Sequence, residues 1–294
     1  MTTSPDSDLA LRFLFEQADI RGELVQLDHS LRDIFAVHEY PAGVRRLLGQ
    51  FLAAATLLST NLKFQGKLVL QARSEGQIAL LMAECDSDLN IRAIARGADQ
   101  ARSTEFADLL GRGGHLAITI DPDQGKRYQG IVPLDGDCLA HSLDQYFEQS
   151  EQLSTRFWLA CDGERAAGML LQQLPAQQNP SAEERDQQWE HACTLAETLR
   201  EDELLSVSPT DLLYRLYHQD PVRLFPGRPV RFHCSCSLER SRNALSALDA
   251  AELLDILRER GEISVDCEFC NRQYRFQRED LAELLPGSGE RTLH

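Results

Sequence analysis

The sequence predicts an α+β protein in three parts: a core domain over residues 1–175 with a mostly antiparallel sheet and helices, a helical linker over 176–230, and a small carboxyl-terminal domain over 231–294. Three observations predict this arrangement. Short apolar segments alternate with turn residues in the first part, acidic residues crowd the second, and four of the chain's 8 cysteines lie in the third. With 294 residues, 43% of them hydrophobic, the chain is long enough to bury a sizeable core.

The core domain is predicted to contain one amphipathic helix of about four turns. Its apolar residues recur at helical spacing and form a single stripe, so the helix is expected to be buried on that side. They are Val44, Leu47, Leu48, Phe51, Leu52, Ala55 and Leu58. Short apolar-rich segments bounded by turn residues then predict the strands of the sheet. The strands are predicted at 67–73, 78–84, 91–95, 116–120 and 127–132, with a second helix at 138–149 and a core-bound run from Ala166 to Leu174.

The linker is acidic and carries little apolar surface. Between residues 181 and 203 it has eight acidic side chains against Arg185 and Arg200. A narrow apolar stripe predicts one helix there, formed by Trp189, Ala192, Cys193, Ala196 and Leu199. Ser208 followed by Pro209 is typical of a helix start and predicts a second helix. Two short helices in an acidic connector bury little surface alone, so they are expected to dock onto a neighbouring domain or to stay partly unfolded.

The carboxyl-terminal domain is predicted to mix short strands and helices. A strand is expected at its first cysteine pair, a second strand leads into Cys267, and a short helix is expected at 279–285. The helix between them, at 247–260, is capped by Ser246 or Asp249. It ends before Gly261. Its inward face is predicted to carry Leu248, Leu253, Leu254 and Leu257.

Four clustered cysteines point to a metal site in this domain. Cys234 and Cys236 form a C-x-C pair, and Cys267 and Cys270 form a C-x-x-C pair thirty residues later. Four thiolates complete the tetrahedral shell that zinc prefers and leave no open position, so a structural zinc site is predicted. The alternatives are a buried thiol cluster, a redox pair at Cys267 and Cys270 without metal, or a site in which His233 replaces one cysteine.

A zinc-binding domain of this size depends on its metal. A core of about 60 residues contributes only about 3–5 kcal/mol, whereas a structural zinc contributes about 10–16 kcal/mol that is coupled to folding. Oxidants attack thiolates, so they can convert the ligands into disulfides and release the ion. The site can therefore act as an oxidation sensor. Four cysteines allow three pairings, and the spacing does not choose among them.

The remaining composition limits location and partners. The scattered Cys85, Cys138, Cys161 and Cys193 are expected to be small core residues. A formal net charge of −16 disfavours nucleic-acid binding. No stretch reaches the roughly 20 apolar residues of a membrane span, and the amino terminus lacks a basic or apolar leader, so a cytoplasmic protein without membrane contact is expected.

Several motifs together resemble one family. Besides the two cysteine motifs and TyrArgPhe at 274–276, they are GlyGlyHisLeuAlaIleThrIleAsp at 113–121, TyrGlnGlyIleValProLeu at 128–134, TyrPheGluGlnSerGluGlnLeu at 146–153 and AlaAlaGlyMetLeuLeuGlnGlnLeuPro at 166–175. In this order they resemble the redox-regulated 33-kDa heat-shock chaperones of bacteria, the 33-kDa chaperonin family.

The resemblance implies an ATP-independent holdase, not an enzyme. It implies that Cys234, Cys236, Cys267 and Cys270 hold one zinc in the reduced, inactive form. It also implies that oxidation pairs Cys234 with Cys236 and Cys267 with Cys270, releases the zinc and destabilises the linker. The oxidised form is then expected to dimerise and to bind unfolded or oxidatively damaged client proteins.

Two other functions compete with this one. A zinc-ribbon protein of nucleic-acid metabolism would share the cysteine spacing, but residues 234–294 hold eight arginines and twelve acidic residues, which disfavours phosphate binding. A thiol oxidoreductase would use Cys267 and Cys270. No residue is assigned a catalytic role.

Overall fold

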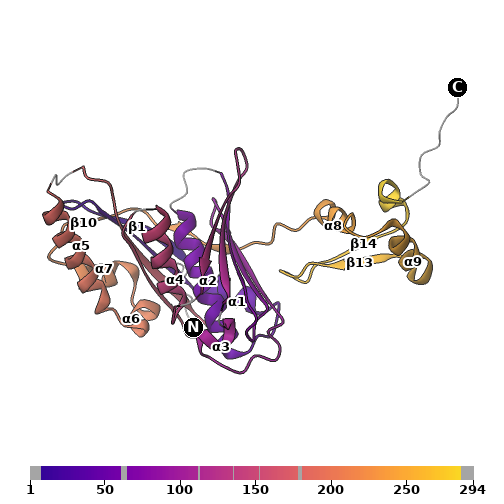
Figure 1. The fold of residues 1–294 in the computed structure, drawn as a ribbon, viewed down its shortest axis with the longest axis horizontal. Helices are drawn as coiled ribbons and strands as arrows, with labels where there is room; N and C mark the ends of the chain where they lie inside the picture. Colours follow the sequence, from indigo (N-terminus) through magenta and orange to yellow (C-terminus); the bar gives the residue numbers. More distant parts are fainter. Residues whose placement is uncertain are drawn as a thin grey trace. The chain divides into compact units, whose positions relative to one another are not determined.

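The computed structural model shows two compact units, which are considered separately (Figure 1). It describes residues 8–285 except 61–64, 112, 135, 152 and 178–180. The first unit spans Met1–His233 and the second Cys234–His294. The division of the first unit into core domain and linker stays a prediction. Among the described residues, none of the helices combines the length and hydropathy needed to cross a bilayer.

One sheet of the first unit joins the amino-terminal strands to a later hairpin. Its order is β10-β1-β2-β9-β8, with β11 also paired to β1, and all of its pairings are antiparallel. The strands are β1 (Leu9–Phe15), β2 (Ile20–Leu27), β8 (Thr155–Cys161), β9 (Ala166–Gln173), β10 (Val222–Leu224) and β11 (Arg228–Pro229). The buried run at β9 confirms the predicted core segment. Strands β1, β2 and β8 were not predicted from the sequence, because this sheet is covered on both faces and its strands lack a clean polar–apolar alternation.

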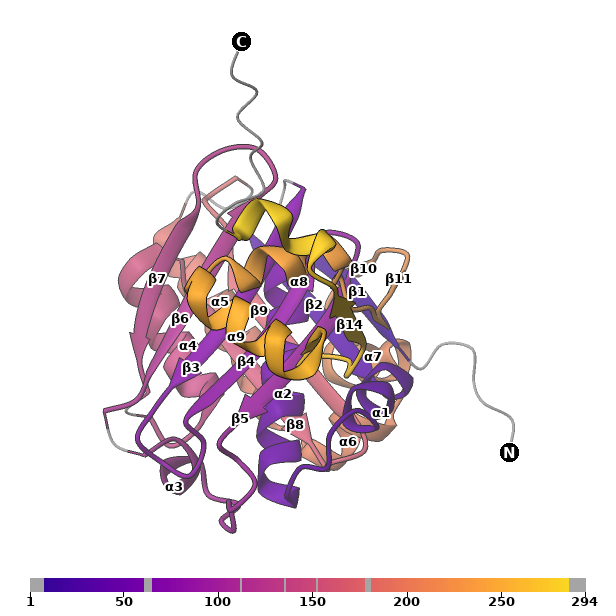
Figure 2. The same cartoon turned by 90° about the vertical axis from the view of Figure 1, so that its right-hand side faces the viewer.

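The second sheet contains all five predicted strands. Its order is β12-β5-β4-β3-β6-β7, and β5, β4, β3, β6 and β7 follow one another across Figure 2. They are β3 (Gly66–Arg73), β4 (Leu80–Asp86), β5 (Asn90–Arg96), β6 (His115–Pro122), β7 (Tyr128–Pro133) and the short β12 (Arg231–Phe232). Among the described strands of this sheet, only β12 pairs in parallel, with β5. The sheet is therefore mostly antiparallel, as predicted, and β4 begins two residues later than expected.

Helix α2 (Ala42–Thr60) packs against strands of both sheets and holds them together. The predicted apolar stripe is buried, as expected, and burial extends beyond it around the helix. From Phe51 to Thr60 every residue is buried. Gly49 lets α2 approach β8, because a Cβ there would overlap the thiol of Cys161. Shorter helices complete the core: α1 (His29–Phe35), α3 (Phe106–Leu110) and α4 (Leu139–Tyr146), the last continuing as a π-helical turn, Phe147–Glu151.

Three helices of the linker pack on the first sheet, on the face opposite α2. They are α5 (Ala182–Glu197), α6 (Glu201–Ser206) and α7 (Pro209–Tyr217). The predicted start at Ser208 is confirmed, since its side chain accepts a hydrogen bond from the backbone of Asp211 and Pro209 opens the helix. Two helices were predicted instead of three, because the apolar pattern of the sequence shows no break between Thr198 and Arg200, where α5 ends and α6 begins.

The linker helices and the sheet share one apolar cluster, which we call the linker interface. Its sheet residues are Phe13, Phe15, Ala18, Ile20, Leu24, Ala160, Ala167, Met169 and Leu171, and its helix residues are Ala192, Cys193, Ala196, Leu204, Leu212, Leu213 and Tyr217. The linker is therefore docked and ordered, one of the two expected alternatives. Phe13 is fully buried there, because the linker helices cover this face of the sheet.

The second unit is small. It contains α8 (Leu238–Leu245), α9 (Ala250–Arg260), β13 (Ile263–Asp266), β14 (Gln273–Phe276) and a 3-10 helix, Glu279–Leu284. Its fully or nearly buried core is Leu245, Leu253, Ile263, Phe276, Leu281 and Leu285. Asp249 caps α9, and Gly261 ends it with a left-handed backbone (φ 78°), both as predicted.

Three details of this unit correct the sequence analysis. Helix α8 was not predicted, although Ser237 caps its start. Leu248 precedes α9 and is 43% exposed, because the helix begins three residues later than expected. The predicted strand at the first cysteine pair does not reach it: β12 stops at Phe232, and Cys234 and Cys236 lie in an irregular segment.

Candidate metal centre

The four cysteines of the two motifs meet at one point of the second unit. The Sγ atoms of Cys234, Cys236, Cys267 and Cys270 all lie within 4.8 Å of one another. Cys234 Sγ lies 3.6 Å from Cys267 Sγ, and Cys236 Sγ lies 3.5 Å from Cys270 Sγ. Residues 33 or 34 positions apart in the chain thus come into sulfur contact. This set can hold a metal ion.

A tight turn between β13 and β14 supplies the second pair. The backbone N–H of Asn271 donates to the Cys267 carbonyl (2.7 Å), and the Cys267 N–H donates to the Arg272 carbonyl (2.9 Å). Asn271 holds the left-handed conformation that closes the turn (φ 54°), a position that asparagine tolerates better than most residues. Backbone N–H groups of Phe269 and Arg272 donate to the thiols of Cys267 and Cys270.

The first pair is held by side chains of α8. The Arg240 guanidinium donates from Nη1 to both the carbonyl (2.7 Å) and the hydroxyl (2.8 Å) of Ser235, the residue between Cys234 and Cys236. The Ser237 hydroxyl accepts from the Arg240 backbone across 3.1 Å. The irregular segment is thereby held to the first turn of α8 at its middle and at its carboxyl end.

The close approach of the four thiols lowers the pKa of one of them and raises the pKa of two others. Burial raises the pKa of Cys236, but hydrogen bonds from Tyr274 and the neighbouring thiols outweigh it and lower the pKa to about 7. Burial and the neighbouring thiols raise the pKa of Cys270 to about 12, and burial with the nearby Cys234 raises that of Cys267. Four thiolates at this spacing repel one another, so a bound cation is needed to keep all four deprotonated.

His233 is not part of this group. Its backbone N–H donates to the Ile91 carbonyl on β5, so it continues the pairing of the first unit. The cluster that the described residues form consists of the four cysteines alone. The hypothesis that a histidine replaces one thiol therefore has no support in the structure.

Comparison with known proteins decides the family. The family model described as Hsp33 protein matches residues 8–277 of this chain. The chain belongs to the Hsp33 family. The 33 kDa chaperonin of Azotobacter vinelandii is 54% identical over 286 residues, covering 97% of this chain and 96% of that protein. The 33 kDa chaperonin of Pseudomonas syringae pv. tomato is 53% identical over 290 residues, again covering 97% and 96%.

A solved structure agrees on the fold. The crystal structure of the 33 kDa chaperonin from Thermotoga maritima matches with a TM-score of 0.79 and 23% identity, covering 94% of this chain and 97% of that one. Membership of the Hsp33 family confirms the resemblance seen in the sequence and makes this protein a heat-shock chaperone. The comparisons give no support to the zinc-ribbon or oxidoreductase alternatives.

The other cysteines of this Hsp33 protein lie in three buried positions and one exposed position. Burial raises the pKa of Cys85 and Cys193 to about 12 and that of Cys161 to about 11, so these thiols stay protonated at neutral pH. The expectation that Cys138 is also a core residue was wrong. It precedes α4 and is exposed.

Sequence reasoning missed two polar residues that matter for the site and the linker. Tyr274 donates a hydrogen bond to Cys236 Sγ across 3.1 Å. Gln26 on β2 donates from Nε2 to the carbonyls of Leu204 (2.9 Å) and Val207 (2.8 Å), where α6 ends. Tyr274 was noted in the TyrArgPhe motif, but its contact with Cys236 was not predicted. Gln26 gave no signal, because it lies 178 positions away from Leu204 in the chain.

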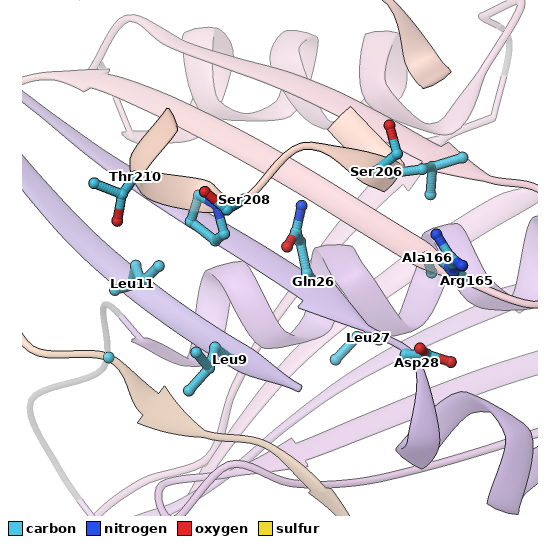
Figure 3. Close-up of a pocket in the computed structure, with 13 residues that line it drawn as sticks. Leu9, Leu11, Gln26, Leu27, Asp28, Arg165, Ala166, Ser206, Ser208 and Thr210 are labelled. Carbon is cyan, nitrogen blue, oxygen red and sulfur yellow. The ribbon is translucent and has the colours of Figure 1, made fainter. Parts of the chain in front are cut away.

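Gln26 stands at the edge of a cavity of about 600 Å³ between the sheet and the linker (Figure 3). Leu9, Leu11 and Leu27 line the sheet side, and Ser206 and Ser208 line the side of the linker. Figure 3 shows the Gln26 side chain pointing toward the segment between the two serines. The junction of α6 and α7 is therefore held by polar contacts beside an open space, in addition to the packing of Leu204, Leu205 and Val207 at the linker interface.

Proposed function

We propose that this heat-shock chaperone is an ATP-independent holdase that oxidation switches on. One observation carries the proposal: four thiols within 4.8 Å of one another form the centre of a unit in which six apolar residues of the described range, 234–285, make up the buried core. Such a core cannot hold the unit together without additional stabilisation. Loss of the metal centre therefore leads directly to loss of the fold.

We assign zinc to the four cysteines. Ligand sulfurs about 2.3 Å from a tetrahedral zinc lie roughly 3.8 Å apart. The separations of 3.5 Å and 3.6 Å, with every pair within 4.8 Å, match this value. When bound, zinc keeps all four sulfurs as thiolates at neutral pH. The all-sulfur ligand set leaves no site for water or substrate, which favours a structural role.

In the proposed oxidised form, Cys234 is joined to Cys236 and Cys267 to Cys270. In the described structure the short sulfur contacts instead cross between the two motifs, from Cys234 to Cys267 and from Cys236 to Cys270. Disulfides have strict geometry, so sequential pairing requires the turn at Asn271 and the segment at Ser235 to rearrange. We infer that oxidation and loss of this local fold accompany each other.

The client surface in this proposal is the sheet side of the linker interface. Phe13, Phe15 and Ile20 are buried beneath the linker helices, and release of these helices would expose them. Contiguous exposed apolar surface binds other apolar chains. The linker leads into the cysteine segment through β10, β11 and β12, which pair with β1 and β5 of the first unit. In this proposal, unfolding of the second unit frees these short strands to detach, and the linker helices then leave the sheet.

Further properties belong to the same proposal. We propose that the active form is a homodimer, that the protein works in the cytoplasm, and that it has no catalytic activity. Nucleic acid is not a proposed partner, because the formal charge of −16 opposes polyanion binding. Its partners are unfolded or oxidatively damaged proteins.

Peroxide treatment at mildly elevated temperature tests the proposal. We expect release of one zinc per chain, loss of ordered structure in the second unit, and suppression of the aggregation of a chemically denatured client. Peptide mapping is expected to find the two sequential disulfides. If zinc leaves and aggregation is never suppressed, the holdase assignment fails. Efficient reduction of insulin disulfides would instead favour a thiol oxidoreductase.

A further inference from the structure

One of the four cysteines receives a hydrogen bond from a side chain of β14. The Tyr274 hydroxyl donates to Cys236 Sγ across 3.1 Å, and the Arg272 guanidinium interacts with the same hydroxyl. Backbone N–H groups provide the corresponding donors for Cys267 and Cys270. The donor to Cys236 is therefore one that a side-chain substitution can remove without altering the turn.

The Tyr274 ring has a separate structural role. It packs against the apolar core of the second unit and lies opposite Val265 in the β13–β14 pair, while its hydroxyl reaches Cys236. Replacement by phenylalanine keeps this ring contact and deletes only the donor. The two roles of Tyr274 can therefore be separated by experiment.

We propose that Tyr274 is a positioning residue that protects the Cys236 thiolate and so sets how much peroxide the switch requires. This inference rests on the proposed function, because it concerns oxidation of the same four thiolates. A hydrogen bond to a thiolate holds electron density that the sulfur must donate when it attacks, so the bond weakens in the transition state and slows the reaction. Arg272, by polarising the hydroxyl, strengthens the donor.

Hydrogen peroxide is the oxidant in this step and accepts the two electrons that the thiolates lose. The Cys236 thiolate attacks one peroxide oxygen, the O–O bond breaks, and hydroxide leaves with the other oxygen. A second thiolate then attacks the sulfenic sulfur, forms the S–S bond and expels a second hydroxide. Two thiolates lose two electrons in total, and one hydrogen peroxide gains them. Tyr274 acts on the first attack only.

The test compares zinc release from full-length, reduced, zinc-loaded protein under excess hydrogen peroxide, followed with a chromogenic chelator. Tyr274→Phe is expected to release zinc about three- to tenfold faster than the wild type, because a hydrogen bond to a charged group is lost. Its zinc content before oxidation is expected to be unchanged. Tyr128→Phe is the matched control: it deletes a hydroxyl that bonds Tyr146 across 3.0 Å on the first unit, and its rate is expected to be that of the wild type.

Arg272→Gln keeps the proposal testable if Tyr274→Phe fails to retain zinc. It is expected to accelerate release by a smaller factor alone and to add nothing in the Tyr274→Phe background, since both act through one hydroxyl. The inference is overturned if Tyr274→Phe releases zinc at the wild-type rate or more slowly. If Tyr274→Phe does not retain zinc, the same result in Arg272→Gln overturns it. Zinc release is measured without a client protein, so it is independent of holdase activity. If the wild type releases zinc but never acts as a holdase, the proposed function is refuted, and the release rates of the variants still decide the role of Tyr274.

Discussion

The side-chain amide of Gln26 on β2 donates a hydrogen bond of 2.9 Å to the carbonyl of Leu204, near the end of α6. The same nitrogen donates to Val207 across 2.8 Å. Carbonyls at a helix end lack partners within the helix, so the sheet itself completes the hydrogen bonding of α6. This contact ties the middle of the linker to the core, beside the cavity of about 600 Å³.

Gln26→Leu is expected to loosen the linker without changing the metal centre. The substitution keeps the size of the side chain and leaves both carbonyls without their donor, which costs about 1–3 kcal/mol. Hydrogen exchange in residues 201–217 should become faster, and holdase activity should appear at milder oxidation. Gln129→Leu removes a hydrogen bond to Thr119 on the second sheet and serves as the control. Unchanged exchange in 201–217 would show that Gln26 does not hold the linker.

Cys193 offers a direct readout of linker release. It lies in the linker interface, is 9% exposed, and burial raises its pKa to about 12. In the reduced protein it should react with maleimide very slowly, and after oxidation and linker release its rate should approach that of an ordinary thiol. Mass spectrometry of alkylated peptides measures this. Cys85 is the internal control, because its pKa is also about 12 but its burial does not involve the linker.

Equal protection of Cys193 and Cys85 in fully oxidised, active protein would contradict the proposed opening of the linker. Equal reactivity of both would instead indicate that the whole first unit unfolds. Only selective exposure of Cys193 fits a client surface on the sheet beneath the linker helices.

The sequence was informative where one helix or turn leaves a local residue pattern that does not depend on distant parts of the chain. The stripe from Val44 to Leu58 identified α2, and the turn residues around 121–125 separated β6 from β7. It failed for β1 and β8, because a strand covered on both faces shows no alternation and its partner comes from distant sequence. Leu248 was wrongly placed inside for a related reason: the true cap, Asp249, and the alternative Ser246 give equally plausible helix starts.

The cysteine site was predictable because each short motif, C-x-C or C-x-x-C, places two thiols close enough to bind one metal ion. The four thiols do meet, as expected. The surrounding donors were not predictable, since Tyr274 and Arg240 act only once the turn and α8 are formed. Cys138 shows the limit of composition arguments, because a lone cysteine can be exposed as easily as buried when it precedes a helix.

The pH dependence of stability should carry a contribution from Asp144 on α4. Burial raises its pKa to about 6, against the opposing effects of Arg156 and the Phe157 backbone N–H, which it accepts across 2.9 Å. The folded protein therefore keeps the proton up to about pH 6, whereas the unfolded chain releases it near pH 4. The folded state binds more protons in this window, so stability falls as the pH rises from about 4 to about 6.

Asp144→Asn should make the decrease in the free energy of unfolding between about pH 4 and about pH 6 smaller, by at most about 3 kcal/mol. The free energy of unfolding is measured by urea unfolding between about pH 4.5 and about pH 7, in steps of about 0.5 pH unit. Tryptophan fluorescence follows the unfolding, because Trp189 lines the same cavity of about 360 Å³ as Asp144. Asp123→Asn, in the exposed turn between β6 and β7, is the control and should leave the slope unchanged. A slope in Asp144→Asn equal to the wild type would show that this carboxyl titrates as an exposed one.

The double substitution Cys267→Ser and Cys270→Ser should unfold the second unit even under reducing conditions. Two thiolate ligands are lost, and the remaining core of six buried apolar residues is too small to compensate for about 10–16 kcal/mol of metal-coupled folding energy. Metal analysis should find no bound zinc, and amide exchange should lose protection in 234–285 while β3–β7 stay protected. Cys138→Ser makes the same chemical change at an exposed position and should retain both zinc and fold. A folded second unit without metal in the double variant would mean that its core suffices, and the metal could then not be the element that holds the switch closed.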